Sequence, residues 1–248
     1  MDRPEADYWF APELRFFLAP RHRHGQVRAA CDGTSSLGHM VESLGVPLTE
    51  AGRLAVNGEP AAPGYRPRAG DAVRVGALRR PQPVPRPPRF VLDVHLGTVA
   101  RRLRLVGVDA AYTNDIDDDA LVEQANAQRR VLLTQDRGLL HRRRLWLGGY
   151  VRGARPDEQF RDVLDRFAPP LAPWTRCTAC NGLLVPARKA DVQPWLRPGT
   201  RRTYQSFSRC TGCGRVYWRG AHSRRLETIV TDALRTAGAA AGPSGVPR

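Results

Sequence analysis

Short apolar runs alternate with helical patterns between residues 89 and 166. The runs are rich in Val, Leu and Phe, whereas the segments between them space apolar residues three and four positions apart, as a helix with one buried face does. Strands that alternate with helices predict an α/β domain with a parallel sheet and right-handed crossovers. The predicted strands are 90–92, 110–113, 131–134 and 149–152, and the predicted helices are 98–106, 118–129 and 158–167.

The region before residue 80 predicts a smaller mixed domain. It combines short apolar runs, a serine that can cap a helix, and an Asn-Gly pair, which is the strongest short signal for a hairpin. The predicted elements are a strand at 14–18, a helix from Ser35 or Ser36 to Leu44, a strand with its Asn-Gly turn at 54–59, and a turn with a final strand at 70–75.

Three stretches without these patterns divide the chain. The segment 80–89 contains five prolines and predicts a stiff, extended linker. A second boundary, also rich in proline, precedes the first cysteine pair, and the small residues of the tail predict disorder. The resulting domains are 13–79, 90–168 and 174–226, with the linker at 80–89 and the tail at 236–248.

Aspartates follow three of the predicted strands. Asp93, the cluster from Asp115 to Asp119, and Asp136 come at or just beyond the carboxyl ends of these strands, where parallel sheets bind ligands. Carboxylates that lie close together repel unless a cation neutralises them, and Mg²⁺ and Mn²⁺ prefer oxygen ligands. The pattern therefore predicts a metal site suited to phosphodiester cleavage.

Helix capping is an alternative explanation for the same aspartates. Asp117 or Asp118 suits the start of the second helix, and Asp136 suits a helix that starts at Arg137. A phosphatase with an Asp-x-Asp motif is a weaker alternative, because His95 stands where the second aspartate would be needed.

Four of the five cysteines form two C-x-x-C pairs separated by 29 residues. Each pair lies on a glycine-containing turn, so two thiolates from each can meet at one tetrahedral zinc ion. Four thiolates leave no open position, which makes the predicted zinc structural; a redox C-x-x-C motif is the less favoured alternative. Cysteines used in this way predict a reducing cytoplasm, and Cys31 is left as a plain thiol. The zinc ligands are Cys177, Cys180, Cys210 and Cys213.

The charge balance indicates a polyanionic binding partner. The chain has 39 Lys and Arg against 24 Asp and Glu, a net charge of +15, which attracts nucleic acid. Arginines flank the acidic strand ends, although helical arginines are also common on solvated surfaces. The candidate nucleic-acid contacts are Arg101, Arg102, Arg104, Arg137, Arg142 and Arg143. Aromatic residues of the cysteine module (Tyr204, Phe207, Tyr217 and Trp218) suit either base stacking or a small core, and His222 is a further candidate RNA contact.

Long motifs from residue 89 to 226 resemble a known family. FVLDVHLGTVARRLRLVGVDAAYTNDIDDDALVEQA, RRVLLTQDRGLLHRR, RCTACNGLLVP and RCTGCGRVYWRGAH are similar to the PIN-like ribonuclease domain named for the C-terminus of the Mut-seven exonuclease. The resemblance implies a PIN-type α/β fold, a zinc ribbon, and metal-dependent cleavage of RNA. It assigns catalytic metal ligands to Asp93, Asp118 and Asp136, with Asp115 as a fourth candidate and the middle ligand ambiguous within 117–119.

The motifs LGVPLTE, VNGE and GDAVRV near the N-terminus resemble the ubiquitin-like β-grasp domains of the sulfur carriers of thiamine and molybdopterin synthesis. Sulfur carriers end in a free Gly-Gly, whereas this chain continues through Gly76-Ala77-Leu78-Arg79. The resemblance therefore implies an accessory or binding role for this domain, with a protein partner as one candidate.

These observations lead to one main hypothesis and two alternatives. The main one is a cytoplasmic endoribonuclease with Mg²⁺ or Mn²⁺ at the aspartates, a structural Zn²⁺ at the cysteines, and a tRNA, rRNA or mRNA substrate. The alternatives are a non-catalytic RNA-binding or adaptor protein, and a nuclease that cleaves DNA. A membrane role is not expected, because the chain has no apolar run of about 18 residues.

Overall fold

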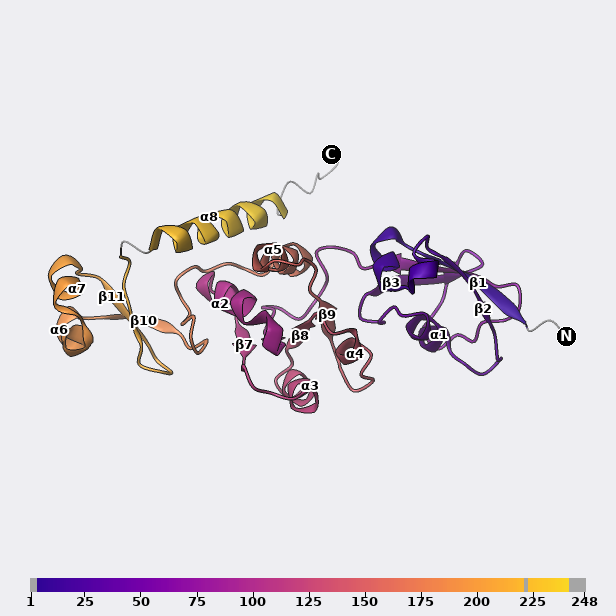
Figure 1. Cartoon of the computed structure of the whole chain (residues 1–248), viewed down its shortest axis with the longest axis horizontal. Helices are drawn as coiled ribbons and strands as arrows, with labels where there is room; N and C mark the ends of the chain where they lie inside the picture. The colour runs from indigo at the N-terminus through magenta and orange to yellow at the C-terminus, as the bar shows by residue number, and fades with distance from the viewer. Residues whose placement is uncertain (1–3, 221–222, 241–248) are drawn as a thin grey trace, which may run out of the picture. The chain divides into compact units, whose positions relative to one another are not determined.

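The structure, a computed structural model, describes residues 4–220 and 223–240 of the chain (Figure 1). The chain forms two compact units. The first combines residues 1–80 with 136–150, and the second combines 81–135 with 151–248. Each unit is described by itself.

The first unit contains a five-stranded sheet in the order β2-β1-β5-β3-β4. β1 and β5 are parallel, and the other neighbouring pairs are antiparallel. α1 (Leu37–Ser43) packs on one face of the sheet, as Figure 1 shows, and Ser36 caps it by accepting a hydrogen bond of 3.2 Å from the His39 N–H. The arrangement is the β-grasp fold that the sequence predicts. The strands are β1 (Glu5–Phe10), β2 (Gln26–Ala30), β3 (Ala51–Val56), β4 (Glu59–Pro60) and β5 (Ala72–Ala77).

The predicted hairpin is present, and both of its turn residues adopt positive φ. Asn57 has φ of 53° and Gly58 has φ of 92°, as a two-residue turn between twisted strands requires. The Asn57 amide also donates a hydrogen bond of 2.9 Å to Asp71, which is buried beside the start of β5. This link holds the turn against the neighbouring strand.

The predicted strand at 14–18 is wrong. The chain forms a 3₁₀ helix at Pro12–Phe17 instead, followed by a shorter one at Pro20–His22. Pro12 fixes φ at the first helical position, and Leu14 and Phe17 are buried three residues apart, which is the period of a 3₁₀ helix. The first strand of the sheet comes earlier, at Glu5–Phe10, where alternate side chains are buried.

The first unit also includes α4 (Arg137–Leu140) and β9 (Gly148–Tyr150). β9 overlaps the predicted strand at 149–152. Tyr150 packs against the hydrophobic core of the β-grasp sheet, and Leu139 and Leu140 are buried. A segment 56 residues beyond Arg80 thus joins the N-terminal domain.

The second unit is built on parallel strands that match the predicted ones. β6 (Phe90–Leu92) lies between β7 (Ala110–Tyr112) and β8 (Val131–Thr134). Helices cover both faces of these strands: α2 and α5 lie together on one face, and α3 lies on the other (Figure 1). The helices are α2 (Gly97–Leu105), α3 (Asp118–Ala127) and α5 (Pro156–Phe167), with a 3₁₀ turn, η3, at Val94–Leu96.

The cysteine module follows as a three-stranded antiparallel sheet, β10-β11-β12. The insert between its first two strands forms short helices that bury Val192 and Leu196 against Phe207. The strands are β10 (Leu184–Ala187), β11 (Phe207–Cys210) and β12 (Val216–Tyr217), and the insert contains α6 (Lys189–Val192), η4 (Gln193–Trp195) and α7 (Pro198–Thr203).

The last element, α8 (Ser223–Ala240), packs on α5. Residues 236–240, which the sequence predicts to be disordered, belong to this helix. Three of these five residues are alanine, which has the highest helix propensity. The rest of the predicted tail, 241–248, and His222 lie outside the described residues. Within 4–220 and 223–240, no helix is both long and apolar enough to cross a membrane.

Candidate functional site

Asp93 leaves the carboxyl end of β6 beside the last residue of β8. The register pairs Leu92 with Leu133, so the next residues, Asp93 and Thr134, are neighbours. The Asp93 N–H donates to the Leu133 carbonyl at 3.0 Å, and the Thr134 hydroxyl donates to Asp93 Oδ2 at 2.6 Å. Asp93 is 6% exposed and Thr134 is fully buried. The carboxylate is therefore held in one orientation at the sheet edge.

A second contact holds the turn that follows Asp93. The Tyr112 hydroxyl, at the end of β7, donates a hydrogen bond of 2.8 Å to the Val94 carbonyl. A Cβ at Gly97 would lie 2.6 Å from this hydroxyl oxygen, so a larger residue where α2 begins would displace the Tyr112 side chain from this bond. The ends of β6 and β7 are thus tied together around the first turn of the site.

The acidic cluster after β7 is exposed. Asp115, Asp118 and Asp119 face solvent in the loop and in the first turn of α3. Asp117 accepts a hydrogen bond of 2.8 Å from the Ala120 N–H and caps α3, which is the alternative role that the sequence suggested for it. Asp118 is the first helical residue.

Asp136 follows β8 by two residues and caps α4. Its Oδ1 accepts a hydrogen bond of 2.6 Å from the Gly138 N–H, as the capping alternative predicts. Asp93 and Asp118 belong to the second unit and Asp136 to the first. Among the residues that the structure describes, the carboxylates form no group of three that could share one ion. Their joint role as metal ligands stays a prediction.

The predicted RNA-binding arginines differ in how far their side chains are exposed. Arg101, Arg142 and Arg143 are exposed, and Arg102 forms an ion pair with Asp157. Arg104 is instead 3% exposed and cannot reach a phosphate. Arg137 donates hydrogen bonds to the backbone carbonyls of Phe16 and Phe17.

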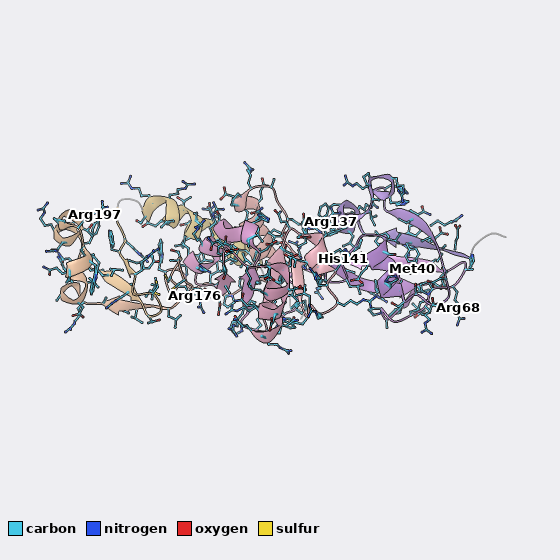
Figure 2. All side chains as sticks on the ribbon, turned by 60° about the horizontal axis from the view of Figure 1, so that its bottom comes forward. Met40, Arg68, Arg137, His141, Arg176 and Arg197 are labelled. Carbon is cyan, nitrogen blue, oxygen red and sulfur yellow. The ribbon has the colours of Figure 1, made fainter. Side chains whose placement is uncertain are left out.

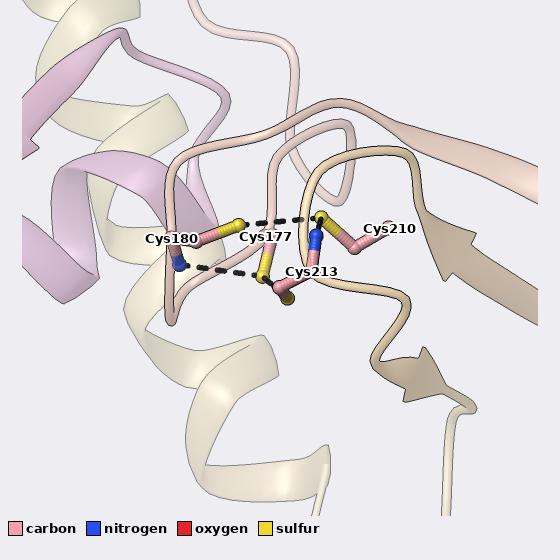
Figure 3. A group of neighbouring side chains, drawn as sticks. All are labelled: Cys177, Cys180, Cys210 and Cys213. Atoms are coloured by element: carbon pink, nitrogen blue, oxygen red, sulfur yellow. Dashed lines mark hydrogen bonds between the residues drawn. The ribbon is translucent and has the colours of Figure 1, made fainter.

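The four predicted cysteine ligands converge (Figure 3). Their Sγ atoms all lie within 4.8 Å of one another, with 3.7 Å between Cys177 and Cys213 and 3.4 Å between Cys180 and Cys210. Zn–S bonds of about 2.3 Å in a tetrahedron separate the sulfurs by about 3.8 Å. The residues therefore fit a tetrahedral zinc ion, and the predicted convergence of the four cysteines is confirmed.

Backbone and side-chain donors surround the sulfurs. The N–H groups of Cys180 and Cys213 point at Sγ of Cys177 and Cys210 respectively, both at 3.4 Å. Burial raises the pKa of the Cys177 thiol, but hydrogen bonds from the Tyr217 hydroxyl and backbone N–H groups outweigh it and lower this pKa to about 6. Tyr217 Oη lies 3.0 Å from Cys177 Sγ. Donors of this kind stabilise thiolates, the form that binds zinc.

The loop that carries the first cysteine pair is anchored to the α/β domain. Arg104, on α2, donates to the carbonyls of Ala110 at 2.7 Å and Ala179 at 2.8 Å. Asn181 donates to Asp109 at 2.8 Å, and its side-chain oxygen accepts from the Ala110 N–H at 3.1 Å. The loop that carries Cys177 and Cys180 is thus hydrogen-bonded to α2 and to the start of β7.

The aromatic residues of the module serve mainly as core and ligand support. Phe207 is buried, Tyr204 packs against the same cluster, and Tyr217 contacts Cys177. Trp218 remains 42% exposed.

Sequence reasoning missed three residues that organise the site. The sequence predicts Thr134 only as the last residue of a strand, does not single out Asp109, and assigns Arg104 to RNA binding. Strand register would have paired Thr134 with Asp93, because the two predicted strands are parallel neighbours. Asp109 and Arg104 depend on contacts with a loop about 70 residues away, for which the pattern of the chain has no signal.

Two protein families match the chain. The family described as the Mut7-C RNAse domain matches residues 88–230, more than half of the chain, and the family described as Mut7-C ubiquitin matches residues 3–82. The chain is 32% identical over 123 residues to the human protein named exonuclease mut-7 homolog, an alignment that covers 42% of this chain and 14% of the relative. The chain thus spans about one seventh of that relative's length. The crystal structure of the H. volcanii small archaeal modifier protein 1 aligns with 32% of this chain and 98% of its own, at 21% identity and a TM-score of 0.24.

Proposed function

The chain belongs to the Mut7-C RNAse domain family, with a Mut7-C ubiquitin domain before it, and from this premise we propose that it is a metal-dependent ribonuclease. The observation that carries the proposal is the oriented Asp93 carboxylate, held by Thr134 at the edge of the parallel sheet. A carboxylate that is buried to 6% exposure at the carboxyl end of a central strand suits a ligand site better than a surface position.

Asp136 follows the hydrogen-bonded partner of Asp93 closely along the chain. Asp136 is two residues beyond Thr134, a path that spans at most about 7 Å between Cα atoms. Thr134 in turn is hydrogen-bonded to Asp93. Short-range connectivity therefore supports the pairing of Asp93 with Asp136.

The acidic residues after β7 are the third part of the proposed site. β7 is the parallel neighbour of β6, so the carboxyl ends of the two strands lie at the same edge of the sheet, and α3 follows β7 from that edge. In α/β proteins ligands bind outside the carboxyl ends of the strands, and the strand order places the switch in direction between β6 and β8, beside Asp93. We assign Asp118 to the site, with Asp115 as a fourth candidate.

The donor set suits Mg²⁺ or Mn²⁺, because these ions prefer carboxylate oxygens and retain water. Bound by Asp93, Asp118 and Asp136, such an ion would activate water and neutralise charge on the cleaved phosphate. Thr134 fixes the orientation of Asp93. Asp136 accepts a hydrogen bond from Gly138, and this cap holds its carboxylate at the start of α4.

Exposed arginines that lie close to the aspartates in the sequence would bind the RNA backbone. Arg101 lies on α2, which begins four residues after Asp93, and Arg142 and Arg143 follow α4. Each would neutralise one phosphate, and the net charge of +15 adds long-range attraction. The zinc would have a structural role, since four thiolates leave it no open position. A reducing cytoplasm would keep those thiolates available.

One observation favours the alternative of a non-catalytic RNA-binding or adaptor protein. Asp117 and Asp136 both cap helices, which accounts for these two carboxylates without a metal ion. Under this alternative RNA binding survives EDTA, and no products form at any Mn²⁺ concentration.

The experiment that tests the proposal is cleavage of end-labelled RNA and DNA oligomers by the full chain in Mn²⁺, with and without EDTA. The proposal predicts RNA fragments that require the metal, with DNA cleaved more slowly or not at all. Internal fragments at early times indicate endonuclease action, whereas a ladder from one end indicates exonuclease action. RNA that stays intact in Mg²⁺ and in Mn²⁺ would contradict the proposal.

A further inference from the structure

Residues 136–150 belong to the same compact unit as the β-grasp domain, although the rest of the RNase region forms the other unit. This segment begins with Asp136, a candidate catalytic ligand. Its first helix, α4, has only four residues, too few to be stable without tertiary contacts. The position of the Asp136 turn therefore depends on what the segment contacts.

Arg137, which is labelled in Figure 2, makes the first of these contacts. Its guanidinium donates to the Phe17 carbonyl at 3.1 Å and to the Phe16 carbonyl at 3.0 Å. The guanidinium also lies over both rings. Its Cζ atom is 4.5 Å from the centroid of the Phe16 ring and 5.3 Å from the centroid of the Phe17 ring. One side chain thus combines two hydrogen bonds and two cation–π contacts on the 3₁₀ helix of the β-grasp domain.

Further contacts hold the rest of the segment. The Tyr150 N–H donates a hydrogen bond of 2.8 Å to Glu50, whose side chain is buried. The Tyr150 ring packs on Phe16 and Phe17, with centroids 5.0 and 5.3 Å apart. His141 Nδ1 lies 3.9 Å from Glu42 Oε1. The segment is therefore attached at its start, middle and end.

The Asp136 carboxylate is coupled to this attachment through one peptide unit. Asp136 caps α4 by accepting from the Gly138 N–H, and Arg137 is the residue between them. A shift of Arg137 would displace the cap and with it the carboxylate. We propose that Arg137 is a positioning residue, and that the β-grasp domain holds the Asp136 turn of the RNase site through it.

This inference rests on the proposed nuclease function. It gives the β-grasp domain a structural role in the same chain, which is to hold the Asp136 turn. It also replaces the expectation that Arg137 contacts RNA. The two roles differ in what they require of the side chain. A phosphate contact needs one positive charge, which lysine supplies, whereas the fork that reaches two carbonyls and stacks on two rings needs arginine.

The test compares Arg137→Lys and Arg137→Ala in the full chain with Arg28→Ala as the matched control. Arg28 also belongs to the β-grasp domain, where it pairs with Asp7 on the surface. Three quantities are measured: the Mn²⁺ concentration for half-maximal cleavage, the KM for RNA, and the hydrogen-exchange rate of the Gly138 amide. We expect both Arg137 variants to raise the Mn²⁺ requirement about tenfold, in the range of lost ligand-orienting contacts. Exchange at Gly138 should be about tenfold faster, with the KM for RNA unchanged.

The Lys variant decides between the two roles. Full activity in Arg137→Lys, together with a raised KM in Arg137→Ala, would show a phosphate contact and overturn the inference. Wild-type exchange at Gly138 in both variants would also overturn it. If the wild-type chain cleaves no RNA, the proposed function fails by itself, while exchange at Gly138 and direct Mn²⁺ titration still test the positioning role. Arg137→Lys retains the charge and the stem, so it remains informative if Arg137→Ala does not fold.

Discussion

The hydroxyl of Thr134 donates a hydrogen bond of 2.6 Å to Oδ2 of Asp93, and both side chains are buried. The pair joins the carboxyl ends of β6 and β8, the strands that precede two of the candidate metal ligands. A neutral donor fixes the direction of the carboxylate without cancelling its charge. The relationship makes Thr134 a supporting residue whose effect on cleavage can be measured.

Replacing Thr134 by Val should impair cleavage while the fold is retained. Valine keeps the shape of the side chain but cannot donate, so Asp93 loses its orienting partner. We expect a loss of about 10- to 100-fold in activity or metal affinity, the range seen when partners of metal ligands are removed. Thr134→Ser keeps the hydroxyl and should retain most activity. Equal rates for the Val and Ser variants would show that the bond has no role.

Zinc content tests the cysteine cluster. The purified chain should contain about one zinc ion, and Cys177→Ser should lower this content to near zero, because the tetrahedral site loses a thiolate. Element analysis by mass spectrometry measures the stoichiometry, and thermal unfolding should show that the module loses stability with its metal. Cys31→Ala is the matched control, since Cys31 is buried in the β-grasp core and should not affect zinc. A full complement of zinc in Cys177→Ser would contradict the assignment.

Arg101 and Arg104 lie on the same helix but should behave differently toward RNA. Arg101 is exposed, so Arg101→Ala should reduce the slope of log K against log salt by about one, as the loss of one phosphate contact does. Arg104 is buried on backbone carbonyls, so Arg104→Ala should leave this slope unchanged and weaken zinc retention. Fluorescence anisotropy with labelled RNA at several salt concentrations gives both slopes. A reduced slope for Arg104→Ala would place this residue on the RNA after all.

Asp109 should contribute stability that depends on pH. Burial raises the pKa of Asp109, but hydrogen bonds from Arg130 and Asn181 outweigh it and hold this pKa below its ordinary value. The contribution is therefore complete above pH of about 4, the unfolded value, and is lost as the pH falls through the lower folded value. Asp109→Asn should cost about 2 kcal/mol in the free energy of unfolding at pH 7 and less at pH 3. Urea unfolding at both pH values measures this difference, and a penalty of equal size at both would contradict it.

Much of the architecture could be predicted from the chain because local patterns determine it. The parallel strands, the Asn-Gly hairpin and the cysteine spacing each depend on a few neighbouring residues. The error at Leu14–Leu18 has the same origin: an apolar run suits both a strand and a 3₁₀ helix, and only burial three residues apart distinguishes them. The preceding strand at Glu5–Phe10 alternates clearly and could have been identified.

The supporting contacts of the site could not be predicted in this way. Arg104 and Ala179 are 75 residues apart, and Arg137 and Phe17 are 120 residues apart. An arginine that binds backbone carbonyls has the same local pattern as one that faces solvent or RNA. Only the tertiary fold distinguishes these uses, whereas the convergence of the cysteines follows from their local spacing.

The central claim is that the aspartates at the strand ends cleave RNA with a divalent ion. The most direct measurement is the rate at which Asp93→Asn and Asp136→Asn cleave a labelled RNA oligomer in Mn²⁺. Asp191→Asn is the matched control, because Asp191 is an exposed residue of the cysteine module that pairs with Arg188. The account predicts a loss of at least about 100-fold for the first two variants, with unchanged RNA binding and zinc content, and a wild-type rate for the control. Cleavage by Asp93→Asn and Asp136→Asn at the wild-type rate would contradict it.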